Sequence, residues 1–167
     1  VSFSIRASSI MGLIGRNGAG KTTTIKSILR LVRPDGGSVE FLGQPVDDDA
    51  AALRREAGYV SGDFCYYPRK RLSQLTAVTK SFYSAWDDAK YHALLARFSL
   101  DDTKRVCELS AGMKVKYQLA CALSHGAKLL ILDEPTSGLD PVSRDDLLDL
   151  LRTLCEQDGV SILFSTH

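Results

Sequence analysis

The sequence contains the octapeptide Gly15-Arg16-Asn17-Gly18-Ala19-Gly20-Lys21-Thr22, which matches the phosphate-binding pattern G-x-x-x-x-G-K-[ST]. The apolar run Ile10–Ile14 directly before it predicts a strand, and apolar residues at helical spacing from Lys21 to about Leu31 predict a helix after it. Glycines let successive backbone N–H groups converge on phosphate oxygens, and the start of a helix adds a positive dipole end. The octapeptide therefore predicts a P-loop in an α/β fold.

Individual residues of this loop have distinct expected contacts. Lys21 would reach the outer phosphates of a bound nucleotide, and the hydroxyl of Thr22 would be offered to Mg²⁺. The order of the glycines, G-x-x-G-x-G, differs from the G-x-G-x-x-G order of dinucleotide-binding loops. The predicted nucleotide-binding residues are Gly15, Asn17, Gly18, Ala19, Gly20, Lys21, Thr22 and Thr23.

Two acidic residues follow a second apolar run. Residues 129–132 form a continuous apolar stretch of strand length, and Asp133 and Glu134 come directly after it. Carboxylates at the carboxyl end of a parallel strand lie at the edge where α/β sheets bind ligands. Asp133 is therefore predicted to hold Mg²⁺ with Thr22, and Glu134 to accept a proton from the water that attacks the γ-phosphate. Taken alone, the two carboxylates would instead cap the next helix.

The rest of the chain predicts a mainly parallel sheet with helices. Because no strand pattern is found from Leu72 to Ser124, we expect a helical insertion subdomain at approximately residues 72–124 of a single domain, 1–167. Further strands are predicted at 1–5, 38–42, 58–60 and 160–164, and further helices at 50–56, in two stretches within 75–98, and at 112–123 and 144–156.

Composition excludes several classes of protein. With 21 Lys+Arg against 20 Asp+Glu, the formal net charge is +1, which gives no electrostatic reason to expect nucleic-acid binding. The four cysteines are scattered without a C-x-x-C pair, so neither a zinc site nor a disulfide framework is indicated. The longest apolar run, Leu119–Leu123, is far shorter than the about 20 residues needed to span a bilayer.

Further short motifs occur in a specific order. Leu109-Ser110-Ala111-Gly112-Met113 precedes a predicted helix, Ser137-Gly138-Leu139-Asp140 follows Glu134, and His167 follows the last predicted strand. With the P-loop and Asp133, these motifs make the chain resemble the nucleotide-binding subunit of ATP-binding cassette (ABC) proteins over essentially every residue. Within that family it is most similar to the bacterial ABC-2-type export branch. The combination is specific because other P-loop classes lack the L-S-x-G signature.

The resemblance implies two such domains closing head to tail over two ATP molecules, in a two-fold symmetric dimer. The predicted signature residues are Ser110, Ala111, Gly112 and Met113, of which Ser110 and Gly112 would contact the γ-phosphate bound by the opposite P-loop. Asp140 of the D-loop would organise the interface, while Glu134 and His167 would be catalytic. In isolation, Ser110 is an ordinary N-cap, Asp140 caps a helix and His167 is a solvated end; for Asp140 both roles can hold.

The chain departs from the family pattern in two places. Family members commonly carry a Gln that ligates Mg²⁺ in the loop after the strand matching 58–60, whereas this chain has Gly62 there and Asp63 as the nearest candidate substitute. If Asp63 replaces that Gln, Asp63→Ala should weaken Mg²⁺-dependent hydrolysis more than ATP binding. Ala111 and Met113 also replace the usual Gly and Gln of L-S-G-G-Q.

The function implied by the resemblance is an ATP-hydrolysing subunit that powers a separate transmembrane exporter. It would bind ATP and Mg²⁺ and lie in the cytoplasm, on the inner face of the cell membrane, against a permease subunit and a second ABC subunit. Residues 64–67 and 75–98 occupy the region that meets the membrane subunit in transporters, or else form a packed surface loop and core helices. The alternatives are a soluble ABC ATPase acting on DNA or the ribosome, and a weakly hydrolysing nucleotide-binding regulator.

The resemblance also bears on the two ends of the chain. The aromatic residue that stacks on adenine lies upstream of the first strand in this family, and family members continue beyond the switch histidine, here His167. We therefore expect a chain truncated at both ends, whose last strand lacks a neighbour.

Overall fold

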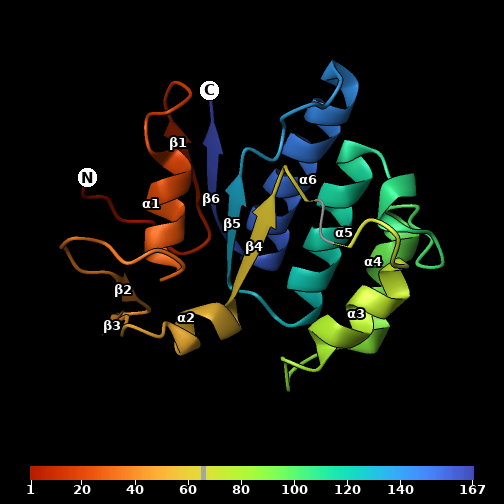
Figure 1. Cartoon of the computed structure of the whole chain (residues 1–167), viewed down its shortest axis with the longest axis horizontal. Helices are drawn as coiled ribbons and strands as arrows, with labels where there is room; N and C mark the ends of the chain where they lie inside the picture. The colour runs from red at the N-terminus through yellow and green to blue at the C-terminus, as the bar shows by residue number, and fades with distance from the viewer. Residues whose placement is uncertain (65–66) are drawn as a thin grey trace.

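The fold is built on a parallel sheet, seen in a computed structural model that describes residues 1–64 and 67–167. Its strands are β1 (Ile10–Ile14), β4 (Ala57–Ser61), β5 (Leu129–Asp133) and β6 (Ser161–Thr166). They lie in the order β1-β6-β5-β4, and every neighbouring pair is parallel. The carboxyl ends of the four strands therefore share one edge, at the top of Figure 1. This arrangement confirms the predicted α/β class.

Helices cover both faces of the sheet. Figure 1 shows α1 (Lys21–Ile28) on one side and α5 (Ala111–Ser124) and α6 (Pro141–Asp158) on the other. All five residues of β5 are buried, as its continuous apolar run predicts. Alternate β5 residues face opposite ways, because Leu129 and Ile131 pack in the core cluster that contains α1, whereas Leu130 and Leu132 pack in the cluster that contains α5 and α6. The sheet is thus held between two apolar cores.

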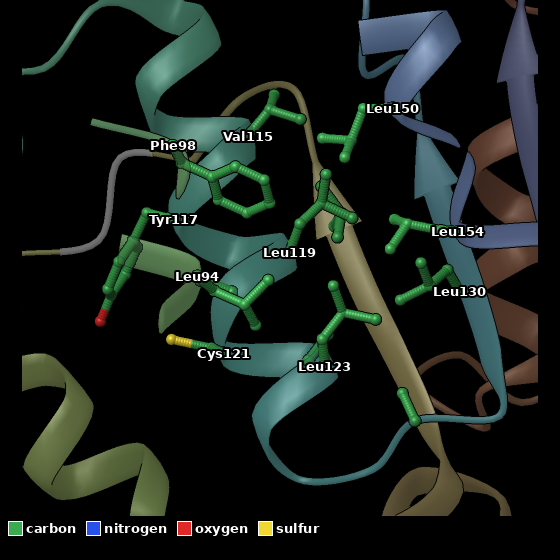
Figure 2. Close-up of a cluster of buried hydrophobic side chains, with 14 of the residues drawn as sticks. Leu94, Phe98, Val115, Tyr117, Leu119, Cys121, Leu123, Leu130, Leu150 and Leu154 are labelled. Carbon is green, nitrogen blue, oxygen red and sulfur yellow. The ribbon is translucent and has the colours of Figure 1, made fainter. Parts of the chain in front are cut away.

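Helical segments occupy the chain between β4 and β5. These are α3 (Leu72–Lys80), α4 (Asp88–Arg97), a short 3₁₀ turn (Val106–Glu108) and α5. Figure 2 shows Phe98 and Leu94 beside Leu119 of α5, with Leu130 of β5 and Leu154 of α6 across the same cluster. Leu119, Leu130 and Leu154 are at most 1% exposed. The cluster therefore joins this helical part to the sheet.

Close packing of α5 on β4 explains a glycine in the sheet. A Cβ atom at Gly58 would overlap the Cβ of Ala122 and also crowd the Leu130 side chain. Only a residue without a side chain allows the helix backbone to approach β4 this closely. The signature helix α5 and the strand that leads to Gly62 are consequently in direct contact.

Three expectations about strands were wrong. Residues 1–5 form no strand, because this segment pairs with no strand in the described chain; Phe3 and Ile5 instead pack against the core cluster that contains α1. The strand expected at 38–42 is reduced to β2 (Glu40–Phe41), which pairs with β3 (Gln44–Pro45) in a separate hairpin. The last strand, β6, does have neighbours, since it lies between β1 and β5. The short helix α2 (Ala51–Glu56) leads into β4.

Candidate nucleotide-binding site

The P-loop connects the end of β1 to the first turn of α1. Gly18 and Gly20 have φ angles of 79° and 91°, in the left-handed region that favours glycine. The Gly15 N–H donates to the Thr166 carbonyl oxygen at 3.3 Å, which ties the loop to β6. Among the described residues no side chain caps α1, so its first N–H groups are available to a phosphate. The other predicted residues, Asn17, Ala19 and Thr23, are exposed along the loop and first turn.

Lys21 is buried within this loop. Its side chain folds back so that Nζ donates to the carbonyl oxygens of Gly15 and Arg16, at 2.6 and 3.2 Å. The same Nζ lies 3.4 Å from Oε1 of Glu134. The predicted phosphate-binding lysine therefore lies against the predicted catalytic carboxylate, which follows a different strand.

Asp133 and Thr22 meet as predicted for a magnesium site. The Thr22 hydroxyl donates to Oδ1 of Asp133 at 3.0 Å, joining the first turn of α1 to the end of β5. Hydroxyl and carboxylate oxygens are the hard ligands that Mg²⁺ prefers, and Mg²⁺ commonly uses only one or two protein side chains together with substrate phosphates. Within the described residues no group of three or more His, Cys, Asp or Glu could hold a metal. The residues present therefore fit a magnesium ion held jointly with a nucleotide.

Glu134 lies between two cationic or potentially cationic side chains. Besides Lys21 at 3.4 Å, Nε2 of His167 lies 3.3 Å from Oε2 of Glu134. The backbone of Glu134 is left-handed, with φ of 51°, an uncommon conformation for a residue with a side chain. The structure therefore brings the two predicted catalytic residues together, next to the P-loop lysine.

At the expected Gln position the chain runs close to the backbone of Glu134. The Gly62 N–H donates to the carbonyl oxygen of Asp133 at 3.0 Å, and a Cβ at Gly62 would overlap the carbonyl oxygen of Glu134. Asp63 is exposed, and its N–H donates to the Ser61 hydroxyl at 3.3 Å. In the described part of the chain no hydrogen bond or ion pair joins the Asp63 carboxylate to the magnesium pair Thr22 and Asp133.

The signature residues lie at the start of α5. The Ser110 hydroxyl accepts from the Met113 N–H at 3.2 Å, so Ser110 is the N-cap, and Ala111 begins the helix. A Cβ added at Gly112 would lie 3.5 Å from Cδ2 of Leu139, in the segment that carries Asp140. Over the described chain no hydrogen bond joins this segment to the P-loop, and Figure 1 shows α1 and α5 on opposite sides of the sheet. Signature and P-loop are thus separate in one chain.

Asp140 is the N-cap of α6. Its carboxylate accepts from the N–H of Ser143 at 3.0 Å and from the Ser143 hydroxyl at 2.6 Å. These two hydrogen bonds, the side-chain one first, lower the pKa of Asp140 below its ordinary value because they stabilise the charged form. The capping role that the sequence allowed for Asp140 is present.

Sequence reasoning missed three polar residues around the site. Tyr59 donates to Oδ2 of Asp133 at 3.4 Å, and the hydroxyl of Ser165 donates to Oδ1 at 2.8 Å. The Gln118 amide accepts from the Ser61 N–H and donates to its carbonyl oxygen, at 3.0 and 2.9 Å, so α5 holds the end of β4. Ser165 and Tyr59 could have been found from the sequence, because each is a polar residue inside an otherwise apolar strand. Gln118 lies on a helix and had no comparable signal in the sequence.

A P-loop at the carboxyl edge of a parallel sheet, with its threonine against the carboxylate that ends another strand of that sheet, defines a P-loop nucleotide-binding ATPase fold. Residues 1–137 match the sequence profile of the family described as ABC transporter. The chain therefore belongs to the ABC transporter family. None of the described helices is long and apolar enough to cross a membrane.

Known proteins similar to this chain belong to the same family. It is 38% identical over 173 residues to Nod factor export ATP-binding protein I of Burkholderia lata, an alignment that covers 100% of this chain and 56% of that protein. The structure of cbiO1 from Clostridium perfringens, part of the ABC transporter complex cbiONQ, is similar with a TM-score of 0.82 and 25% identity, over 100% of this chain and 70% of that one.

A second solved structure is the ATP-binding cassette MJ0796, a dimer in a post-hydrolysis state bound to ADP and Pi. Its TM-score is 0.79 at 25% identity, covering 99% of this chain and 77% of that one. Together with the curated relatives, these structures support the predicted ABC ATPase class. The chain spans about half the length of the curated relatives it matches.

Proposed function

We propose that the full-length protein is the ATP-hydrolysing subunit of an exporter. The observation that carries the proposed ATP hydrolysis is the position of Glu134, whose carboxylate lies between Lys21 and His167 and one residue after Asp133. The export role is supported by the similarity to Nod factor export ATP-binding protein I. A general base for ATP hydrolysis needs a carboxylate beside the phosphate-binding lysine and the metal-holding residues. Glu134 satisfies this requirement with groups from three separate segments of the chain.

The P-loop would bind the phosphates of ATP through backbone N–H groups and Lys21. The Lys21 ammonium is held by the carbonyl oxygens of Gly15 and Arg16 and by Glu134. Phosphate oxygens carry more negative charge than these carbonyls, so ATP would draw the ammonium toward itself. Binding would thereby separate Lys21 from Glu134 and free the carboxylate.

Thr22 and Asp133 would hold Mg²⁺ through their hydroxyl and carboxylate oxygens. When bound, the ion supplies positive charge that offsets the negative charge developing on the phosphates. Glu134 would orient the attacking water and accept its proton, and His167 would donate a hydrogen bond to the γ-phosphate. The contacts of Thr22 with Asp133, and of Glu134 with Lys21 and His167, support these proposed tasks.

Two copies, or one copy and a different ABC subunit, would close over two ATP molecules. A hollow of about 90 Å³ is lined by residues that include Ser110, Gly112 and Met113 of the signature and Ser143 of α6. Its position at the start of two helices suits an anion presented by a second subunit. The dimeric MJ0796 structure supports this arrangement.

A groove beside β4 is the proposed contact with a membrane subunit. It encloses about 540 Å³ between β4, α3 and α5 and is mostly apolar, and exposed Val78 and Tyr67 lie along it. A cytoplasmic helix of a transmembrane permease would bury its apolar face here. Support comes from Nod factor export ATP-binding protein I and from cbiO1, which is part of a transporter complex. The protein would therefore lie on the inner face of the cell membrane.

Gentle purification of the tagged full-length protein in detergent tests this proposal. We expect a protein with several membrane-spanning segments to co-purify, and ATP hydrolysis by the complex that requires Mg²⁺. Co-purification of ribosomes or DNA-repair factors would instead support a soluble ABC ATPase. Binding of ATP without hydrolysis, with or without a membrane partner, would support a nucleotide-binding regulator.

A further inference from the structure

The hydroxyl of Ser165 bridges two neighbouring acidic residues of the site. Ser165 lies on β6 and is fully buried. Its Oγ donates to Oδ1 of Asp133 at 2.8 Å and accepts from the N–H of Glu134 at 2.9 Å. The Ser165 hydroxyl therefore acts both as a donor, to the Asp133 side chain, and as an acceptor, from the Glu134 backbone.

The first of these hydrogen bonds orients the Asp133 carboxylate. Oδ1 also accepts from the Thr22 hydroxyl at 3.0 Å, and Oδ2 accepts from the Tyr59 hydroxyl at 3.4 Å. Thr22 is itself a proposed magnesium ligand, and the Tyr59 contact is long. Ser165 is consequently the best placed group to keep Asp133 oriented toward a metal without being a ligand itself.

The second hydrogen bond supports an unfavourable backbone conformation. Glu134 has a left-handed φ of 51°, which a residue with a side chain adopts only when its surroundings compensate. In this conformation its carboxylate faces Lys21 and His167. Because His167 follows Ser165 by two residues, the end of β6 fixes both the backbone of Glu134 and one partner of its carboxylate.

We infer that Ser165 is a positioning residue for the hydrolysis site, acting through Asp133 on magnesium binding and through the Glu134 backbone on the catalytic base. This inference rests on the proposed ATPase function. On this inference, the buried Ser165 hydroxyl keeps Asp133 and Glu134 aligned with each other. Removal of an outer group that orients a metal ligand typically lowers metal affinity or activity by about 10–100-fold.

The test compares Ser165→Ala with Ser161→Ala in the full-length protein. Ser161 is the matched control, because it lies on the same strand and its hydroxyl also accepts a backbone N–H, that of Ser8, at the strand end away from the site. Three quantities are measured for each variant: kcat and KM for ATP, affinity for a fluorescent ATP analogue with Mg²⁺ and with EDTA, and the thermal unfolding midpoint. Ser165→Cys, with a similar shape and a weaker donor, is a second variant should Ser165→Ala fail to fold.

We expect Ser165→Ala to lower kcat by about 10–100-fold and to reduce the gain in affinity that Mg²⁺ provides by about 10-fold. Binding in EDTA should stay within about twofold of the parent, and Ser161→Ala should match the parent in all three measurements. An unchanged kcat and magnesium gain, or an equal loss of binding in EDTA, would overturn the inference. If the parent binds ATP with a magnesium gain but does not hydrolyse it, the ATPase proposal fails while the affinity comparison still tests Ser165.

Discussion

The Nζ atom of Lys21 lies 3.4 Å from Oε1 of Glu134, so the P-loop cation and the proposed catalytic base form an ion pair. Lys21 is almost fully buried, while the Glu134 side chain is 31% exposed. On the proposed function, the terminal phosphate of ATP would contact this pair, because Lys21 is the P-loop lysine. We therefore expect bound ATP to replace Glu134 as the negative partner of Lys21, which would link nucleotide binding to release of the base.

Replacing the carboxylate of Glu134 by an amide separates these two roles. Glu134→Gln should depress ATP turnover by about 10²-fold or more, because an amide cannot accept a proton from the attacking water. ATP affinity should be retained or increased, since the competing carboxylate on Lys21 is gone. Turnover is measured by phosphate release and affinity by equilibrium titration. Parent-like turnover in Glu134→Gln would exclude Glu134 as the base.

Restoring the family's Gln at position 62 should harm this protein. A side chain there would overlap the carbonyl oxygen of Glu134, so the backbone of the base must shift. Displacing a catalytic group by about 1 Å can cost about 10²-fold, and we expect Gly62→Gln to lower kcat by that order. Gly36→Gln is the control, because a Cβ at Gly36 meets open space. Higher activity in Gly62→Gln would contradict this reading of the loop.

Asp63→Ala tests whether Asp63 takes the place of the Gln that family members carry in this loop. If Asp63 substitutes for the missing Gln, its loss should weaken Mg²⁺-dependent hydrolysis more than ATP binding. The described structure joins its carboxylate to neither Thr22 nor Asp133, although its place beside Gly62 keeps it near the end of β4. Equal rates of hydrolysis in Asp63→Ala and the parent would discard the substitution.

The P-loop and Asp133–Glu134 could be predicted from sequence because each is a local pattern tied to the end of a buried strand. The contacts of Ser165 and Gln118 could not, because they depend on which strands and helices become neighbours, and sequence order does not give the spatial order β1-β6-β5-β4. The same limit explains the error about β6, which follows every other strand in the chain yet lies inside the sheet. The alternation of apolar and polar residues around Phe3 and Ile5 correctly indicated that these two side chains pack on the core, but it wrongly predicted that the segment pairs as a strand.

The groove beside β4 gives a prediction about the membrane partner. Val78 of α3 lies on the groove and is 60% exposed, so Val78→Glu should place a charge in the proposed interface without disturbing the core. We expect the membrane subunit to be lost on purification while ATP binding persists. Leu148→Glu, at an exposed position on α6, should retain the partner. Retention of the membrane subunit by Val78→Glu would place its docking surface elsewhere.

Stability should depend on pH through His125, the C-cap residue after α5. The imidazole is buried and stacked on Tyr83, with ring centroids 3.9 Å apart and an interplanar angle of 8°. Burial lowers the pKa of His125 below its ordinary 6.5, because the charged form loses its hydration. The folded protein therefore holds a neutral imidazole at pH values where the unfolded chain begins to bind a proton.

The sign of the effect follows from this difference in proton binding. Stability contributed by the neutral His125 is present above the unfolded pKa of 6.5 and is lost as the pH falls below it toward the folded value. His125→Phe keeps a flat ring against Tyr83 but cannot titrate. The drop in unfolding midpoint between about pH 8 and about pH 5.5 should therefore be smaller in His125→Phe than in the parent. His92→Phe, at an exposed histidine on α4, should keep the parent's drop. An equal drop in His125→Phe and the parent would contradict a lowered pKa of His125 in the folded chain.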